Sequence, residues 1–300
     1  MTDLIGIATW NFAEGTLAER IDRFAAMGYN AISLNTRDAR PLASGQMPDV
    51  DDAILRHGLP ITIHGGLAPK GDPIPHDAVI EEFKSYAEWH ARTGLLVSVN
   101  FDAAKVQTDT GEWEPRCGEM HDILAEMLSI SNGFTVGIED WPRSAGDLAV
   151  VEDLRAYPHY GMLIDLGHLN MRIPKSDDLD HPFSIDAARE YLDQMALPVN
   201  ELHIHNNDGK RDLHAPPTTG TSDLRALAEL LASMGKVESA SRSGGSPCPP
   251  GKLACVSTIE LVPAWCGLTD EQGFLAARDA LAFWKTASKC GGVSPHAQEL

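Results

Sequence analysis

Short apolar runs that end in small or polar residues recur along the whole chain. Stretches with apolar residues at helical spacing, such as Leu17, Ile21 and Phe24, lie between these runs. Thr269 and Gln272 fit a capping box, in which two side chains satisfy exposed backbone N–H groups at a helix start. The pattern predicts eight strands that alternate with helices. The predicted strands cover residues 4–10, 31–35, 60–66, 95–102, 135–141, 161–168, 201–208 and 256–263.

The regular alternation of strands and helices indicates a parallel sheet, and eight such units are the number that closes into a (β/α)8 TIM barrel. A doubly wound open sheet is the alternative, but no Gly-x-Gly-x-x-Gly motif follows the first predicted strand. The length of 300 residues also suits a single α/β barrel. We therefore expect one (β/α)8 barrel domain over residues 1–300.

The barrel fold assigns a role to each kind of loop. Catalytic side chains lie at the carboxyl ends of the strands, whereas the helix-to-strand connections lie at the opposite, N-terminal face. The Ser-, Gly- and Pro-rich segment 236–254 is one of these connections, so we expect an irregular insertion there that is mobile or contacts another subunit of a homo-oligomer. The loops at about residues 101–117, 168–183 and 206–221 face the catalytic end and are candidate lids.

The charge balance excludes several classes of partner. The chain has 24 Lys and Arg against 43 Asp and Glu, a formal charge of −19, which disfavours nucleic acid and anionic membranes. It has neither a long apolar segment nor a signal-peptide pattern, so we expect a cytoplasmic protein. The cysteines lack metal or redox spacing, and we interpret them as reduced thiols. They are Cys117, Cys248, Cys255, Cys266 and Cys290.

Side chains that can bind a metal gather at the ends of the predicted strands. Glu139 and Glu260 each share a strand face with threonines, while the Ile and Val residues between them point the other way. Several buried carboxylates side by side are costly unless a cation neutralises them, so the pattern predicts a divalent ion. The residues at the strand ends are His64, Asn100, Glu139, Asp165, His168, His203, His205 and Glu260.

Other residues near the strand ends allow two interpretations. His203 and His205 share one strand face, and one of the two can be a hydrogen-bonding partner of a ligand, although His205 is nearer the strand end. Asp212 and His214 belong either to a solvated charge cluster or to a contact with substrate or a second metal. Trp10 and Trp141 are expected either in the floor or wall of a pocket or as plain core aromatic residues.

These motifs resemble the xylose-isomerase-like barrels, a family that includes sugar and sugar-phosphate isomerases and epimerases as well as endonuclease IV. The resemblance covers nearly the whole chain and is carried by Gly-Ile-Glu139-Asp, Ile-Asp165-Leu-Gly-His168, His203-Ile-His205 with Asp208, and Thr-Ile-Glu260. It implies one divalent ion, Mn, Mg, Co or Zn, held by Glu139, Asp165, His205 and Glu260. His205 is preferred over His203 because the ligand histidine of the family is followed three residues later by an acid.

The resemblance also implies a reaction on a carbohydrate-like small molecule. Glu139 and Glu260 would move a proton next to a carbonyl through an enediolate, giving an isomerase or epimerase of a sugar, sugar phosphate or related polyol or keto compound. The substrate contacts are expected from His64, Asn100, His168, Arg211, His214, Trp10 and Trp141.

Other functions remain as alternatives at the level of the sequence. The same enediolate can expel a β-hydroxyl group, so a metal-dependent dehydratase of an inosose or keto acid is the second interpretation. An endonuclease IV-like or other metal-assisted hydrolase is the third, and it is weakened by Asn100, where the endonuclease branch has a histidine. A sugar-binding barrel without activity would lose one of the two glutamates, and both are present.

Overall fold

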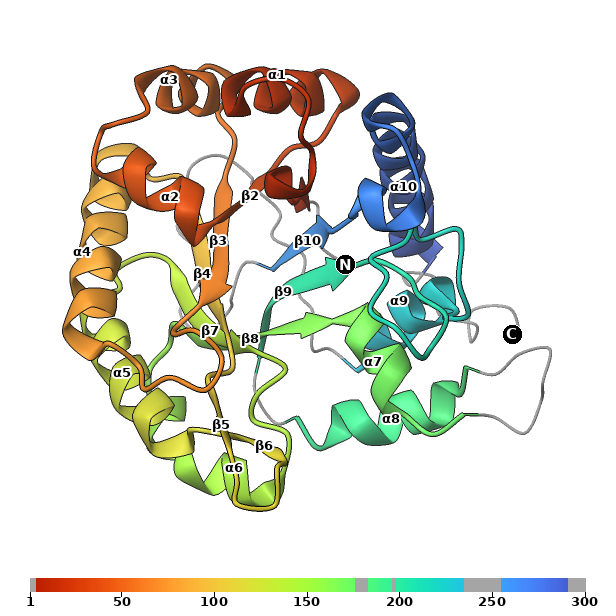
Figure 1. Ribbon diagram of the computed structural model, residues 1–300. Helices are drawn as coiled ribbons and strands as arrows, with labels where there is room; N and C mark the ends of the chain where they lie inside the picture. Colours follow the sequence, from red (N-terminus) through yellow and green to blue (C-terminus); the bar gives the residue numbers. More distant parts are fainter. Residues whose placement is uncertain (1–3, 176–182, 196–197, 235–254, 291–300) are drawn as a thin grey trace, which may run out of the picture.

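The computed structural model describes residues 4–175, 183–195, 198–234 and 255–290, and these form a (β/α)8 TIM barrel (Figure 1). The parallel strands are hydrogen-bonded in the order β1-β10-β9-β8-β7-β4-β3-β2. An isolated parallel bridge between Ala8 and Ser33 brings β1 next to β2, so the barrel is nearly closed. The barrel strands are β1 (Leu4–Ile7), β2 (Ile32–Asn35), β3 (Ile61–Gly66), β4 (Leu96–Asp102), β7 (Thr135–Glu139), β8 (Tyr160–Asp165), β9 (Val199–Ile204) and β10 (Val256–Ile259).

Helices surround the strands and bury their apolar faces against the outside of the barrel (Figure 1). The helix predicted from Leu17, Ile21 and Phe24 is α1, and all three side chains are buried. Thr269 and Gln272 form both backbone hydrogen bonds of the predicted capping box before α10. The helices are α1 (Leu17–Met27), α2 (Thr36–Ala43), α3 (Pro48–His57), α4 (His76–Thr93), α5 (Cys117–Ile130), α6 (Ala145–Val150), α7 (Leu166–Arg172), α8 (Ile185–Asp193), α9 (Leu224–Ser233) and α10 (Asp270–Cys290), with single 3-10 turns η1 (Thr9–Asn11), η2 (Asp153–Ala156) and η3 (Pro263–Cys266).

The apolar runs of the sequence continue past the ends of several strands. The strand predicted over 161–168 ends at Asp165, because the Asp165 side chain accepts a hydrogen bond from the His168 backbone N–H at 2.7 Å and so caps α7. Residues 9–11 form η1 instead of extending β1. These two strands therefore end where the backbone turns into a helix, and Asp165 lies at one of these turns.

A polar layer fills the barrel beneath its catalytic end. The fully buried Glu201 carboxylate accepts hydrogen bonds from the hydroxyls of Thr62 and Thr258 at 2.8 and 2.6 Å, and from the Asn100 amide at 2.8 Å. Burial favours the neutral acid, yet hydrogen bonds from His203 and the two threonines hold the pKa of Glu201 below its usual value. The polar layer thus carries the negative charge of the Glu201 carboxylate beneath the site.

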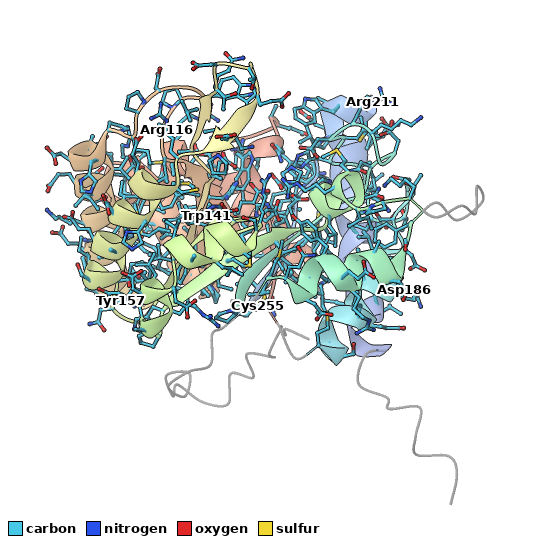
Figure 2. All side chains as sticks on the ribbon, turned by 90° about the horizontal axis from the view of Figure 1, so that it is seen from below. Arg116, Trp141, Tyr157, Asp186, Arg211 and Cys255 are labelled. Atoms are coloured by element: carbon cyan, nitrogen blue, oxygen red, sulfur yellow. The ribbon has the colours of Figure 1, made fainter. Side chains whose placement is uncertain are left out.

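The loops at the carboxyl ends of the strands are built from short ordered elements. The expected lid at residues 101–117 contains a hairpin of β5 (Lys105–Gln107) and β6 (Trp113–Pro115). The Lys70 ammonium lies 4.2 Å above the Trp113 ring, and the Arg116 guanidinium donates to the Gly71 carbonyl at 3.0 Å, so the hairpin packs on the β3–α4 loop. Figure 2 shows Arg116 and Arg211 at this end of the barrel and Cys255 toward the other.

Some expectations fall on residues outside the described part. The insertion at 236–254, Cys248 and part of the expected lid at 168–183 lie there, so these predictions stay as stated. Cys117, Cys255 and Cys266 are free thiols. Among the described helices, none has the length and apolar character of a membrane span.

Candidate active site

Asp165 lies at the centre of a cluster of acids and imidazoles at the carboxyl end of the barrel. Its carboxylate, 1% exposed, is 2.9 Å from Nε2 of His205 and 3.8 Å from Nδ1 of His203. Burial opposes ionisation, but the neighbouring imidazoles of His205 and His168 outweigh it and hold the pKa of Asp165 well below its usual value. The position of Asp165 at the N-cap of α7, where its carboxylate accepts from the His168 backbone N–H, fixes the orientation of this side chain.

Glu139 ends β7 and approaches the cluster from one side. Its carboxylate is 2.8 Å from Nδ1 of His168 and 3.7 Å from Nε2 of His64. Burial raises the pKa of Glu139 to about 7, and the ion pair with His168 only partly opposes this shift.

Glu260 follows β10 and approaches from the other side. Its carboxylate is 2.8 Å from Nδ1 of His203 and 3.5 Å from Nδ1 of His214. Burial alone would raise the pKa of Glu260, but His203 above all lowers it to about 2. The two glutamates that the sequence proposes as catalytic are thus each held by a different histidine.

The His205 ring fits into a slot without spare room. On one side, a Cβ atom at Gly167 would lie 1.9 Å from Cε1 of His205, so only glycine leaves space for the ring. On the other side, the His214 ring stacks on His205 with centroids 4.0 Å apart. The glycine of the Asp165-Leu-Gly167-His168 motif is therefore required by close packing, and its φ is not in the left-handed region.

The donor atoms suit a divalent cation. Glu139, Asp165 and His168 form one group in which the donor atoms lie within 4.8 Å of one another, and Asp165, His203 and Glu260 form a second. Asp165 belongs to both groups and also contacts His205. Among the described residues, Nδ1 of His205 is buried without a hydrogen-bond partner, and so are one nitrogen each of His64, His203 and His214, as expected of nitrogens free to bind a ligand. Carboxylate oxygens with imidazole nitrogens match Mn, Mg, Co or Zn.

The two groups leave the choice of the imidazole ligand open. His203 joins Asp165 and Glu260, whereas His205 contacts Asp165 and also forms a group with Asp212 and His214. Three of the proposed ligands thus lie next to the fourth, Asp165: they are Glu139, His205 and Glu260. That these four residues bind an ion stays a prediction. His64 belongs to a further group with Asp102 and Glu139.

The residues predicted to contact substrate lie at different depths. His64, His168 and His214 line the cluster, and the Trp10 ring stacks on His64 with centroids 6.3 Å apart. Three others are engaged elsewhere. Asn100 belongs to the polar layer around Glu201, Trp141 is fully buried in the hydrophobic core, and Arg211 is 73% exposed and paired with Asp208 at 3.0 Å.

The sequence interpretation missed Asp140, which positions His168. The Asp140 carboxylate is 3.0 Å from Nδ1 of His168, accepts from the backbone N–H of Asp165 at 3.1 Å and pairs with Arg172. Its φ of 50° is unusual for a residue other than glycine, and such strain is typical of functional sites. The only sequence signal was its place directly after Glu139.

Among the comparisons with known proteins, the one with solved structures finds the same fold. No family model and no curated protein matches the sequence. Among solved structures, a D-tagatose 3-epimerase-like protein superimposes with a TM-score of 0.66 at 15% identity, covering 96% of this chain and 97% of that one. The 3-keto-D-glucoside 4-epimerase YcjR from E. coli gives 0.61 at 19% identity, covering 94% and 99%. The IolI protein with a bound zinc atom gives 0.62 at 16% identity, covering 97% and 99%.

Proposed function

We propose that this protein is a divalent-metal-dependent isomerase or epimerase of a sugar, a sugar phosphate or a related polyol or keto compound. The observation that carries the proposal is the arrangement of Glu139 and Glu260, which approach the same aspartate from two different strands. Two carboxylates on different sides of one cluster are what a proton transfer between two carbons, or two faces of one carbon, requires. The fold shared with epimerases, and with a zinc-containing barrel, supports this choice of reaction.

Glu139, Asp165, His205 and Glu260 would hold the ion, with His203 as the alternative imidazole. When bound, a divalent ion supplies a Lewis acid that polarises the substrate carbonyl and stabilises negative charge on its oxygens. Glu139 and Glu260 remove and return the proton. The ion pair of His168 with Glu139 and that of His203 with Glu260 would hold the two carboxylates in a fixed orientation.

A dehydratase is the second candidate, and the surroundings of His168 favour it. Nδ1 of His168 contacts Glu139 and Asp140, while Nε2 contacts Asp212 at 3.1 Å. Burial alone would lower the pKa of His168, but the Asp165 carboxylate above all, together with Asp140, Asp212 and Glu139, raises it. An imidazolium next to the proton-transferring glutamate is suited to protonate a departing hydroxyl group.

The test of the proposed function is proton–deuterium exchange in heavy water on a panel of ketoses, ketose phosphates and inososes. We expect exchange at a carbon next to the carbonyl, and we expect Glu260→Gln to abolish it while the thermal unfolding midpoint stays close to that of the parent protein. Glu88→Gln, at an exposed position on α4, is the matched control and should retain full activity. Full activity of Glu260→Gln would exclude the two-glutamate mechanism. Release of water from the substrate would favour the dehydratase.

A further inference from the structure

Three basic side chains follow three neighbouring strands at the carboxyl end of the barrel. Lys105 lies in β5 directly after β4, Arg143 follows β7, and Arg172 ends α7 after β8. Because β4, β7 and β8 are hydrogen-bonded in that order, the connections that follow them lie next to one another. In a chain with nearly twice as many acids as bases, three basic side chains on three neighbouring connections are a local concentration of cations.

The two arginines are tied to the active site through Asp140. The Arg143 guanidinium donates to the backbone carbonyl of Asp140 at 2.9 Å, and the Arg172 guanidinium pairs with the Asp140 carboxylate. The same carboxylate contacts His168, which contacts Glu139. Both guanidinium groups therefore contact Asp140, the residue that directly follows the proton-transferring Glu139 in the sequence.

The third cation is not neutralised by an ion pair. Lys105 is half-buried and has no side-chain hydrogen bond or ion pair with any residue that the structure describes. Burial and the two nearby arginines lower the pKa of Lys105, although Asp102 and Glu139 act in the opposite sense. The Lys105 ammonium group is thus half-buried, and its hydrogen-bond donors have no partner among the described residues, so an anion bound beside the two guanidinium groups would supply one.

We propose that Lys105, Arg143 and Arg172 bind an oxyanion of the substrate, a carboxylate or a phosphate, beside Glu139. This inference rests on the proposed function and narrows its substrate class to anionic carbonyl compounds. Two guanidinium groups and one ammonium group supply the charge-assisted donors that bind such oxyanions. Arg211, which the sequence predicts as a substrate contact, is turned to solvent and paired with Asp208.

The test compares Lys105→Met with Lys70→Met by calorimetric titration of the metal-loaded protein with inorganic phosphate and, separately, with acetate. Lys70→Met removes the same charge at the same end of the barrel, where Lys70 is exposed and stacks on Trp113. We expect the Kd for at least one anion to rise roughly tenfold or more in Lys105→Met and to stay unchanged in Lys70→Met and in Lys105→Arg. The anion that responds identifies the group as phosphate or carboxylate.

Steady-state kinetics provides the second arm. For a ketose phosphate or keto acid that the enzyme turns over, KM should rise roughly tenfold in Lys105→Met with a smaller change in kcat, whereas KM for a neutral ketose should not change. Equal anion binding by Lys105→Met and the parent protein would overturn the proposed oxyanion site. Efficient turnover of neutral ketoses without competition by phosphate would also overturn the oxyanion site, but it would leave the proposed function standing. Lys105-dependent anion binding without exchange on any substrate would support the oxyanion site and refute the proposed function.

Discussion

Replacing Gly167 by alanine tests whether the packing of one ring controls the site. The new Cβ atom would lie 1.9 Å from Cε1 of His205, whereas an ordinary contact begins at 3.4 Å. The difference is about 1.5 Å, which the ring must make up by moving toward His214. His214 is already stacked at a centroid distance of 4.0 Å, so the movement breaks the 2.9 Å contact between His205 and Asp165.

The expected effects on stability and on function differ in size. Overpacking costs about 1–3 kcal/mol of unfolding free energy, and the better helix propensity of alanine in α7 returns up to about 1 kcal/mol. The net loss of stability is therefore roughly 0–3 kcal/mol. A displacement of about 1 Å at a reacting centre lowers turnover about 100-fold, so activity should fall far more than stability.

The measurements for Gly167→Ala are urea unfolding, metal affinity by titration and exchange of substrate protons in heavy water. Gly118→Ala is the control, because Gly118 is also helical and its added Cβ would meet no atom within 4 Å. We expect Gly118→Ala to keep full metal affinity and turnover. If Gly167→Ala binds metal and turns over substrate like the parent protein, the tight fit around His205 has no functional role and the reasoning is wrong.

Three further predictions concern the metal, a surface ion pair and the insertion. Metal analysis of purified protein should find about one divalent ion per chain, and its removal by a chelator should lower both the unfolding midpoint and the exchange rate; an active metal-free protein would contradict the proposed function. Hydrogen bonds from His121 to Asp122 and Asp153 raise its pKa, so His121→Gln should cost less than about 1 kcal/mol of stability at pH 6 and less again as the pH rises and the parent imidazole loses its proton; a cost that grows with pH would contradict this sign. Deletion of residues 240–250 should leave turnover unchanged, and a folded but inactive deletion variant would place that segment near the chemistry.

The barrel itself follows from local patterns that are visible along the chain. Period-two apolar runs and helical spacing are short-range properties, so β3 and α1 are recognisable without any knowledge of their neighbours. The exact ends are not, because the apolar run continues through Leu166, where the Asp165 side chain has already capped a helix. The rule that catalytic side chains lie at the carboxyl ends of parallel strands was then enough to bring Glu139, Asp165 and Glu260 into one predicted cluster.

The sequence by itself determined the fold class and the set of strand-end acids and imidazoles, because strand ends meet at one face in any parallel barrel. Only the tertiary structure decided which neighbour each side chain meets. His64 and Asn100 are partners in register on adjacent strands, yet His64 lies near Glu139 while Asn100 binds Glu201 in the layer below. Such choices depend on strand stagger and on loops that come from distant parts of the chain, such as those that place Lys105 near Arg143 and Arg172, and no local pattern encodes them.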